Sequence, residues 1–236
     1  MKVINRKKIF NKWKEDLEVS GKPNEWEVKQ LMRITGLPVP NEYLLRYDEM
    51  LEDRKFIEYV SDKKDKTFAV KLCSPEILHK TDVGGVVLGV SKKELIAVLK
   101  NLRGRFKKEH FLISQMVSIQ GPEFILGAIE DPVFGPAVMA GAGGILTELY
   151  KDIAFRLAPC SVQEAGYMLE ELTIAPVLSG YRGSSMDIGG LKKIISEFSL
   201  LSAAAAAMGT QLDINPLVWT GNTWLVLDAK AVLETS

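Results

Sequence analysis

Residues 71–90, KLCSPEILHKTDVGGVVLGV, place a polar loop with two glycines between two apolar segments that have the composition of β-strands. The flanking patterns predict strands over Phe68–Cys73 and Val86–Val90. The loop between them holds His79, one of only two histidines in the chain, and the pair Gly84 and Gly85. A neutral imidazole is a competent nucleophile, and glycine lets the backbone approach a phosphate closely. The run therefore predicts a sheet with a connecting loop suited to phosphate chemistry.

Length and composition favour one large domain or two small lobes. The chain has 236 residues, of which 47% are hydrophobic, enough for a sizeable core. Its 30 basic and 30 acidic residues balance, so no bulk charge favours nucleic acid or a membrane surface. The N-terminus has no apolar signal core, no stretch is long enough to span a bilayer, and both cysteines have apolar surroundings. We expect a cytoplasmic protein that binds neither nucleic acid nor membranes.

Helix and strand patterns are mixed without a steady alternation, which favours an α+β fold with largely antiparallel sheets. Capping-box patterns predict helices that begin near Asn24, Ser91 and Ser161. A charged connector over 106–111 indicates a lobe boundary near residue 110. The other expected elements are strands over 111–117, 123–130 and 136–140, a helix over 190–208, and a terminal hairpin of 211–219 and 223–229.

The predicted terminal hairpin brings oxygen-bearing side chains together. Asp213 and Asn215 are two residues apart and share one strand face, while the apolar residues beside them face the other way. A turn at Gly221 brings Asp228 roughly opposite them. Two carboxylates and an amide suit Mg²⁺, which prefers hard oxygen ligands. The alternative is an ordinary polar, solvent-facing side of a hairpin.

The other candidate groups also have two interpretations. The glycines from Gly141 to Gly144 either crowd their N–H groups around an anion or allow a strand to pack tightly against its neighbour. Lys71 ends a predicted strand, where a lysine is either an exposed edge residue or a phosphate ligand. A single histidine is usually a packing residue, as we expect for His110. His79 differs because Lys80 and two glycines surround it.

Three segments resemble one known family, the ATP-grasp subunits of ADP-forming acyl-CoA synthetases, typified by ADP-forming acetyl-CoA synthetase. The resemblance runs from about Glu25 to Val232, and the matching motifs occur in the family's order. They are Ser74-Pro75, His79-Lys80, Asp82 and Gly84-Gly85-Val86 in the first segment; Phe134-Gly135, Gly143-Gly144, Glu148, Lys151-Asp152, Arg156 and Pro159 in the second; and DINPL at 213–217 with DAK at 228–230 in the third.

The resemblance implies a two-lobed ATP-grasp fold with a nucleotide cleft between the lobes. The expected limits are an N-terminal extension over 1–22 and an ATP-grasp domain over 23–236, with lobes of about 23–110 and 111–236. It also implies that His79 carries a phosphoryl group, with Asp213 as a second catalytic residue, and that Asn215 and Asp228 hold Mg²⁺. The residues that it implies for ATP or ADP binding are Lys71, Lys80, Gln115, Val117, Glu123, Gly143, Gly144 and Glu148.

The implied activity is that of an ADP-forming acid–CoA ligase, in which a mobile phosphohistidine loop exchanges phosphoryl with ADP or ATP. A CoA-binding alpha subunit is the implied partner, in a heterotetramer, and it would hold most of the acyl pocket. Three alternatives remain open: a non-catalytic nucleotide-binding regulatory module, an ATP-grasp carboxylate–amine ligase, and the nucleotide-binding part of a protein acyltransferase. A carboxylate–amine ligase does not need His79.

Overall fold

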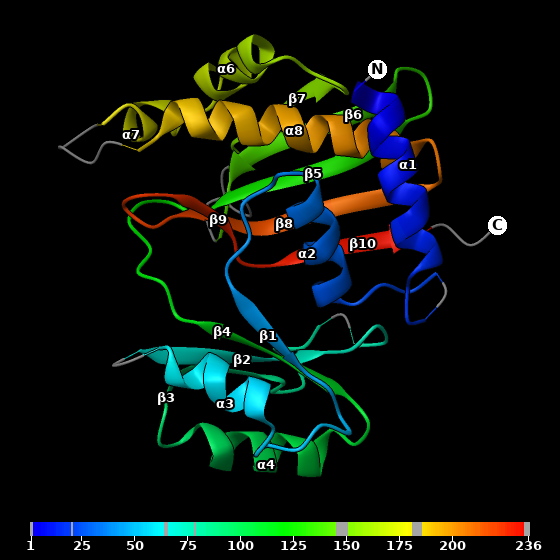
Figure 1. Ribbon diagram of the computed structural model, residues 1–236. Helices are drawn as coiled ribbons and strands as arrows, with labels where there is room; N and C mark the ends of the chain where they lie inside the picture. Colours follow the sequence, from blue (N-terminus) through cyan, green and yellow to red (C-terminus); the bar gives the residue numbers. More distant parts are fainter. Residues whose placement is uncertain are drawn as a thin grey trace. The chain divides into compact units, whose positions relative to one another are not determined.

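The computed structural model describes residues 2–19, 21–63, 66–77, 79–144, 151–180 and 186–233 (Figure 1). The chain forms two compact units. One comprises Met1–Pro23, Glu27–Val39 and Ser118–Ser236, and the other comprises Asn24–Trp26 and Pro40–Val117. Each unit is thus built from separate stretches of the chain. Among the described residues, no helix is long and apolar enough to cross a membrane.

The smaller unit contains a four-stranded antiparallel sheet in the order β1-β4-β2-β3. The strands are β1 (Glu42–Leu45), β2 (Thr67–Cys73), β3 (Val86–Ser91) and β4 (His110–Gln115). Two helices, α3 (Arg54–Ser61) and α4 (Leu95–Arg105), cover one face of this sheet (Figure 1). The two strands that flank the His79 loop, β2 and β3, are therefore direct neighbours at one side of the sheet.

The core of the smaller unit lies between that sheet face and its two helices. Phe56 of α3 and Leu99 of α4 are fully buried or nearly so, as are Phe68 and Val70 of β2. Three leucines on one side of α4, Leu95, Leu99 and Leu102, are buried here. Burial of these side chains fixes β2, and through it the base of the His79 loop.

The larger unit contains a six-stranded sheet in the order β10-β8-β5-β6-β7, with β9 paired to β8. All of the described strand pairings are antiparallel, which confirms the predicted α+β class. The strands are β5 (Phe124–Asp131), β6 (Gly135–Ala142), β7 (Ile153–Leu157), β8 (Thr210–Trp219), β9 (Trp224–Val226) and β10 (Ala229–Leu233).

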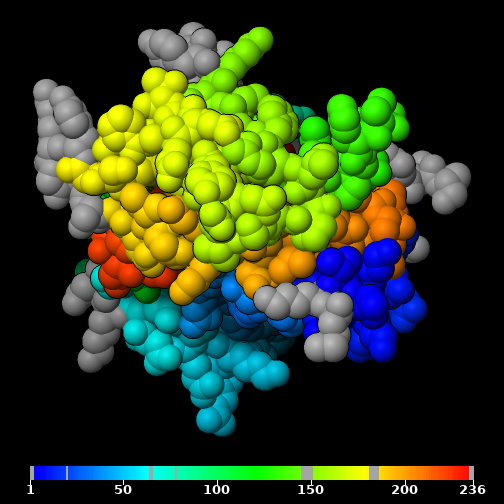
Figure 2. Space-filling model, turned by 90° about the horizontal axis from the view of Figure 1, so that it is seen from above, coloured from blue at the N-terminus to red at the C-terminus, as the bar shows by residue number. Residues whose placement is uncertain are grey.

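One long helix, α8 (Ile188–Ala206), packs along β5, β6 and β8 and forms the centre of the larger unit's core. Helices α6 (Val162–Glu170) and α7 (Ala175–Leu178) follow β7, and α6 packs on α8. In the view from above (Figure 2), α6 and the residues after it form the outer surface over α8. Helix α2 (Glu25–Ile34) adds Val28, Leu31 and Met32 to the same core.

The N-terminal residues form a helix that belongs to this core. Helix α1 (Lys2–Glu15) packs against α8, and Arg6 pairs with Glu197 at 2.5 Å. Phe10 is completely buried and Trp13 nearly so, and the Trp13 Nε1–H donates to the Glu27 carbonyl at 2.8 Å. Two aromatic side chains therefore integrate the expected extension into the larger unit.

Two of the predicted helix starts differ in outcome. The capping box at Ser161 is confirmed, because its hydroxyl accepts from the Glu164 N–H while the Glu164 carboxylate accepts from the Ser161 N–H. The start predicted at Ser91 is wrong. The Glu94 carboxylate does accept from the Ser91 N–H at 3.1 Å and from its hydroxyl at 2.5 Å, but these bonds close a turn, and α4 begins only at Leu95.

The C-terminal hairpin is confirmed and has an additional strand. Strand β9 pairs with residues 217–219 of β8, as the turn at Gly221 predicted. The chain then continues into β10, which the sequence pattern did not separate, and β10 pairs with residues 210–214 of β8. Strand β8 therefore has a neighbour along both edges and lies inside the sheet.

We predict that Phe10→Ala lowers the free energy of unfolding by about 3 kcal/mol, since it removes a fully buried aromatic ring and leaves a cavity. Urea denaturation followed by tryptophan fluorescence measures this loss. The matched control is Ile4→Ala in the same helix, because Ile4 is 63% exposed and its truncation should change stability by less than about 0.5 kcal/mol. Equal effects of the two substitutions would show that α1 is not part of the core.

Candidate functional site

The described part of the His79 loop is a compact turn closed by its own backbone. The Asp82 N–H donates to the His79 carbonyl at 3.2 Å, and the Gly84 N–H donates to the Thr81 carbonyl at 2.9 Å. The Gly85 N–H then donates to the Lys80 carbonyl at 2.7 Å. His79 itself is exposed. Its imidazole is therefore accessible to a phosphoryl donor and is not held in an apolar interior.

Arg105 supports the far end of this loop from the last turn of α4. Its guanidinium donates to the Val83 carbonyl at 2.9 Å and to the Gly84 carbonyl at 3.2 Å. Gly84 has φ +64°, a left-handed conformation that glycine adopts without strain, and a Cβ there would lie 3.0 Å from Arg105 Nη2. The chain can therefore turn sharply into β3 while keeping this contact.

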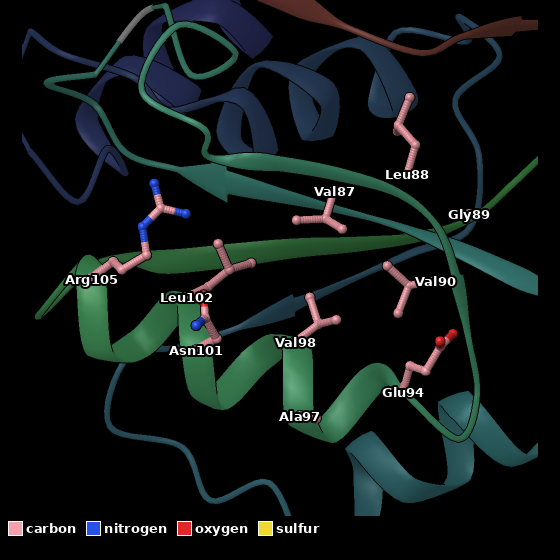
Figure 3. Close-up of a pocket in the computed structure, with 10 residues that line it drawn as sticks. All are labelled: Val87, Leu88, Gly89, Val90, Glu94, Ala97, Val98, Asn101, Leu102 and Arg105. Carbon is pink, nitrogen blue, oxygen red and sulfur yellow. The ribbon is translucent and has the colours of Figure 1, made fainter.

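Arg105 also lines a groove of about 590 Å³ between β3 and α4 (Figure 3). Val87 and Val90 of β3 face Val98 and Leu102 of α4 across it, whereas Leu88 points away from the helix (Figure 3). None of the residues predicted to bind nucleotide or metal lines this groove. It is a mainly apolar groove next to the loop, and the two charged residues that line it, Glu94 and Arg105, are not among the predicted site residues.

Two lysines predicted to bind phosphate share one carboxylate. Lys71 Nζ lies 3.2 Å from Glu25 Oε1, and Lys80 Nζ contacts Glu25 Oε2. The side chains of Lys71, Lys80 and Glu25 are only 13%, 11% and 5% exposed. Lys71 is thus not an exposed edge residue, and Lys80 places a second, largely buried positive charge directly after His79 in the chain.

The metal-site prediction rests on β8, and its geometry agrees with the predicted face. Leu212 and Ile214 are buried, Asp213 is partly buried and Asn215 is exposed, which is the predicted alternation. The Asn215 N–H donates to the Asp228 carbonyl at 3.1 Å. The three residues with oxygen-bearing side chains therefore occur within one short stretch of the paired strands.

Pro216 lies in an irregular part of β8. Between Leu126 and Phe124 of β5 the facing segment of β8 runs from Ile214 to Leu217, so β8 has one extra residue there. An extra residue of this kind is a β-bulge, which reorients the side chains beside it. Strand β8 is internal to the sheet, and the bulge accommodates a residue without an N–H donor.

Asp213 has a perturbed acidity. Burial raises the pKa of the Asp213 carboxyl above its ordinary value, the Asp228 carboxylate raises it further, and the Lys230 ammonium opposes both effects. Lys230 is the direct cross-strand partner of Asp213, and Gly127 is its partner on the other side. A partly buried carboxylate beside a second carboxylate is a site where a cation is favourable.

The predicted nucleotide-binding glycines lie against Glu123. The Gly143 N–H donates to the Glu123 carbonyl at 2.6 Å, and a Cβ on Gly143 would lie 3.0 Å from the Glu123 carbonyl carbon. A Cβ on Gly144 would lie 3.5 Å from Glu123 Oε2. The structure therefore brings Glu123, Gly143 and Gly144 together at the end where β5 begins.

Part of the glycine-rich segment is explained by packing. A Cβ on Gly141 would lie 2.5 Å from the carbonyl oxygen of Asp152, because β6 and β7 approach closely there. The Asp152 carboxylate accepts from the N–H groups of Thr173 and Ile174 at 2.7 and 3.0 Å. Arg156 forms an ion pair with Glu171. These motif positions stabilise the connection from β7 to α7.

The remaining predicted residues have simpler positions. Gln115 is the last residue of β4, and Val117 ends the smaller unit, so their role in nucleotide binding stays a prediction. Glu148 lies outside the described residues. His110 is buried, its ring stacks on Tyr47, and its Nδ1 accepts from the Tyr47 N–H at 3.1 Å, in agreement with the packing role expected for it.

Two charged residues of α2 were not identified as site residues from the sequence. Glu25 bridges the lysines, and Lys29, which is completely buried, donates to the Leu227 carbonyl at 2.7 Å beside Asp228. A signal was present, because both residues share the i, i+3, i+4 stripe with Val28 and Met32. Charged groups within an otherwise apolar helix stripe indicate a buried polar function.

The donor chemistry fits Mg²⁺ and nucleotide phosphates. Two carboxylates and one amide on β8 and the segment before β10 are hard oxygen ligands, and two largely buried ammonium groups suit phosphate. Within the described ranges no group of three or more His, Cys, Asp or Glu side chains is placed to hold a metal. The candidate site therefore depends on Asn215 as its third ligand.

Comparison with known proteins agrees with this chemistry. Residues 18–233 match the ATP-grasp domain family. The chain is similar to the beta subunits of two ADP-forming acetate–CoA ligases of Pyrococcus furiosus. It is 34% identical to the subunit of enzyme I, over 89% of this chain and 90% of that one, and 36% identical to the subunit of enzyme II, over 89% and 91%.

A solved structure of acetyl-coenzyme A synthetase 1 from Ca. Korarchaeum cryptofilum has the same architecture. It superposes with a TM-score of 0.74 at 28% identity, over 97% of this chain and all of that one. That protein was determined with coenzyme A and Mg-AMPPCP, and its phosphohistidine segment points towards the nucleotide-binding site. The chain described here belongs to the ATP-grasp family, in the group formed by the beta subunits of ADP-forming acetate–CoA ligases.

Proposed function

We propose that this chain is the nucleotide-binding subunit of an ADP-forming acyl-CoA synthetase, which converts an acid, CoA and ATP into acyl-CoA, ADP and phosphate. The observation that supports this most directly is the exposed His79, followed by a lysine whose ammonium is fixed by Glu25. An accessible imidazole beside fixed positive charge is suited to receive and release a phosphoryl group. A carboxylate–amine ligase would have no use for this arrangement.

The proposed chemical step is phosphoryl exchange between His79 and the nucleotide. In the direction from ATP, the bond from the γ-phosphorus to the β,γ-bridging oxygen breaks, and ADP keeps the electron pair. A bond from that phosphorus to an imidazole nitrogen of His79 forms at the expense of the nitrogen lone pair. In the other direction a β-phosphate oxygen of ADP attacks the phosphorus, and the imidazole nitrogen regains its electron pair. Such transfer depends mainly on positioning and charge stabilisation, which Lys71 and Lys80 supply.

Asp213, Asn215 and Asp228 would hold the metal ion. Bound Mg²⁺ neutralises charge on the nucleotide phosphates. The chain contributes orientation: the bulge at Asn215 and Pro216 directs the amide, and the Lys29 contact with the Leu227 carbonyl fixes the backbone beside Asp228. Gly143 and Gly144, packed against Glu123, would line the nucleotide's position on the same unit.

A companion alpha subunit is proposed to bind CoA and the acyl group, with the two kinds of chain in a heterotetramer. The similarity to proteins that are named beta subunits supports a partner of this kind. His79 would collect the phosphoryl group that the companion releases when the thioester forms. His79 and residues 81–84 of the loop are exposed, and this part would move during the exchange.

We expect His79→Ala to abolish transfer of labelled γ-phosphate from ATP to the chain, because the accepting nitrogen is lost. The measurement is acid-labile, base-stable label on the protein, located by peptide mass spectrometry. The second histidine provides an internal control, since His110 is only 8% exposed and should stay unlabelled in both proteins. Equal labelling of wild type and His79→Ala would rule out the proposed phosphoryl carrier.

Asp213→Asn should stabilise the fold at neutral pH and weaken nucleotide binding. Because burial raises the pKa of Asp213 above its ordinary 3.8, the folded protein binds this proton more tightly than the unfolded chain. The free energy of unfolding of the wild type therefore falls as the pH rises through the raised pKa. The fall is about 1.4 kcal/mol for each unit by which the pKa in the folded protein exceeds that in the unfolded chain. The Asp213→Asn variant lacks this loss. The amount by which its free energy of unfolding, measured in urea, exceeds that of the wild type should therefore grow between pH 4 and pH 7.

The control for this pH dependence is Asp131→Asn, which should behave oppositely. Backbone N–H groups of Phe134 and Val133 lower the pKa of Asp131, so its carboxylate stabilises the fold above its unfolded pKa and that stabilisation is lost as the pH falls.

The Mg²⁺-dependent affinity for ATP should rise with pH in wild type, since the metal competes with the Asp213 proton. Unchanged affinity in Asp213→Asn would exclude this residue from the metal site.

The isolated chain should not make acyl-CoA from acid, CoA and ATP, and addition of its companion subunit should restore acid-dependent ADP and thioester production. Coupled assays of both products, with and without the co-purified partner, measure this division of labour. The His79→Ala chain with the same partner is the control and should remain inactive. Complete thioester synthesis by the isolated chain would contradict the need for a second subunit.

A further inference from the structure

We propose that Glu25 is a positioning residue for phosphoryl transfer, which holds Lys80 beside His79 and Lys71 at its place on β2. The inference deepens the proposed function and rests on it. In this scheme Glu25 acts through the two ammonium groups and takes no part in the bonds that form or break. Its loss should change how the phosphoryl group is received rather than whether the chain folds.

The contact geometry shows one carboxylate bridging two parts of the smaller unit. Glu25 Oε1 faces the Lys71 ammonium at 3.2 Å, while Oε2 faces the Lys80 ammonium. Lys71 extends from the sheet and Lys80 from the loop. Because each oxygen serves a different lysine, a single rigid group sets the distance between the two positive charges.

Lys80 is fixed at its backbone as well as at its ammonium. Its carbonyl accepts from the Gly85 N–H at 2.7 Å, and the Gly85 carbonyl accepts from the Leu72 N–H at 2.7 Å. A Cβ on Gly85 would lie 2.9 Å from both Leu72 Cβ and the Lys80 carbonyl oxygen, so only glycine allows this approach. The preceding residue, His79, is exposed. The loop thus has a fixed base at Lys80 and an accessible nucleophile next to it.

Electrostatics explains why a carboxylate is needed at a phosphate site. Two ammonium groups that are 13% and 11% exposed would repel each other and lose hydration without a counter-charge. One carboxylate offsets part of this repulsion, and two ammonium groups with one carboxylate still carry a net positive charge. The arrangement remains attractive to phosphate, while the lysines are already ordered before it arrives.

The test is a double-mutant cycle on the rate of His79 labelling by γ-labelled ATP and Mg²⁺, using the full chain. We expect Glu25→Gln to lower the rate at saturating ATP at least tenfold, because Lys80 is no longer held beside His79. In a Lys80→Met background the same substitution should lower it less than twofold, since the residue through which it acts is gone. The half-saturating ATP concentration should still rise in that background through the effect on Lys71.

Glu27→Gln is the matched control, because it makes the same chemical change two residues further along α2. Glu27 accepts from the Glu18 N–H at 2.7 Å, whereas the contacts with Lys71 and Lys80 are made by Glu25. Its labelling rate should equal that of wild type. Glu25→Asp keeps the charge but shortens the side chain and should give an intermediate rate. If Glu25→Gln does not fold by circular dichroism, Glu25→Asp replaces it in the cycle.

The outcomes separate this inference from the proposed function. A wild-type chain that is not labelled at His79 would overturn both. Suppose instead that the wild type is labelled and that Glu25→Gln lowers the labelling rate by the same factor with Lys80 present as in the Lys80→Met background. Only the positioning role is then overturned, because the substitution acts through the structure of α2. A wild-type rate in Glu25→Gln would overturn that role equally. A labelling rate that Glu25→Gln lowers only when Lys80 is present supports the proposal.

Discussion

The shared carboxylate of Glu25 is the interaction that holds two largely buried lysines of the smaller unit together. Burial of two lysines near a sheet is unfavourable unless a counter-charge accompanies them, and this chain supplies it from the first turn of α2. The surrounding core of α3, α4 and the sheet holds β2 in place, while the Gly85 contacts hold the loop base. Rigid support and the exposed imidazole of His79 are thereby combined within a few residues.

In the larger unit, the partly buried charged group is a carboxylate, that of Asp213. Burial and a neighbouring carboxylate raise the pKa of Asp213, so this side chain is less stable as an anion than it would be in water. A bound cation would remove that penalty. In the proposed metal site, Asp213 would therefore weaken the empty protein slightly and favour the form with metal bound. Lys230 across the strand moderates the rise in the Asp213 pKa.

Much of this organisation could be predicted from the sequence, because local patterns determined it. The alternation around Asp213, the turn at Gly221 and the Ser161 capping box each depend on neighbouring residues only, and all are present. The roles of Glu25 and Lys29 depend on contacts with residues 46 or more positions away, such as Lys71 and Leu227, which periodicity does not specify. The bulge at Pro216 was likewise hidden, since it follows from the register against β5.

The burial of Phe10 against a core centred on α8 has a consequence for biosynthesis. Phe10 is synthesised long before its partners, because the helix that covers it begins at Ile188 and the last strand of the same sheet ends at Leu233. Contacts this distant in sequence form slowly, and the nascent segment exposes aromatic side chains until they do. The larger unit can therefore close its interior only after Leu233 has been synthesised.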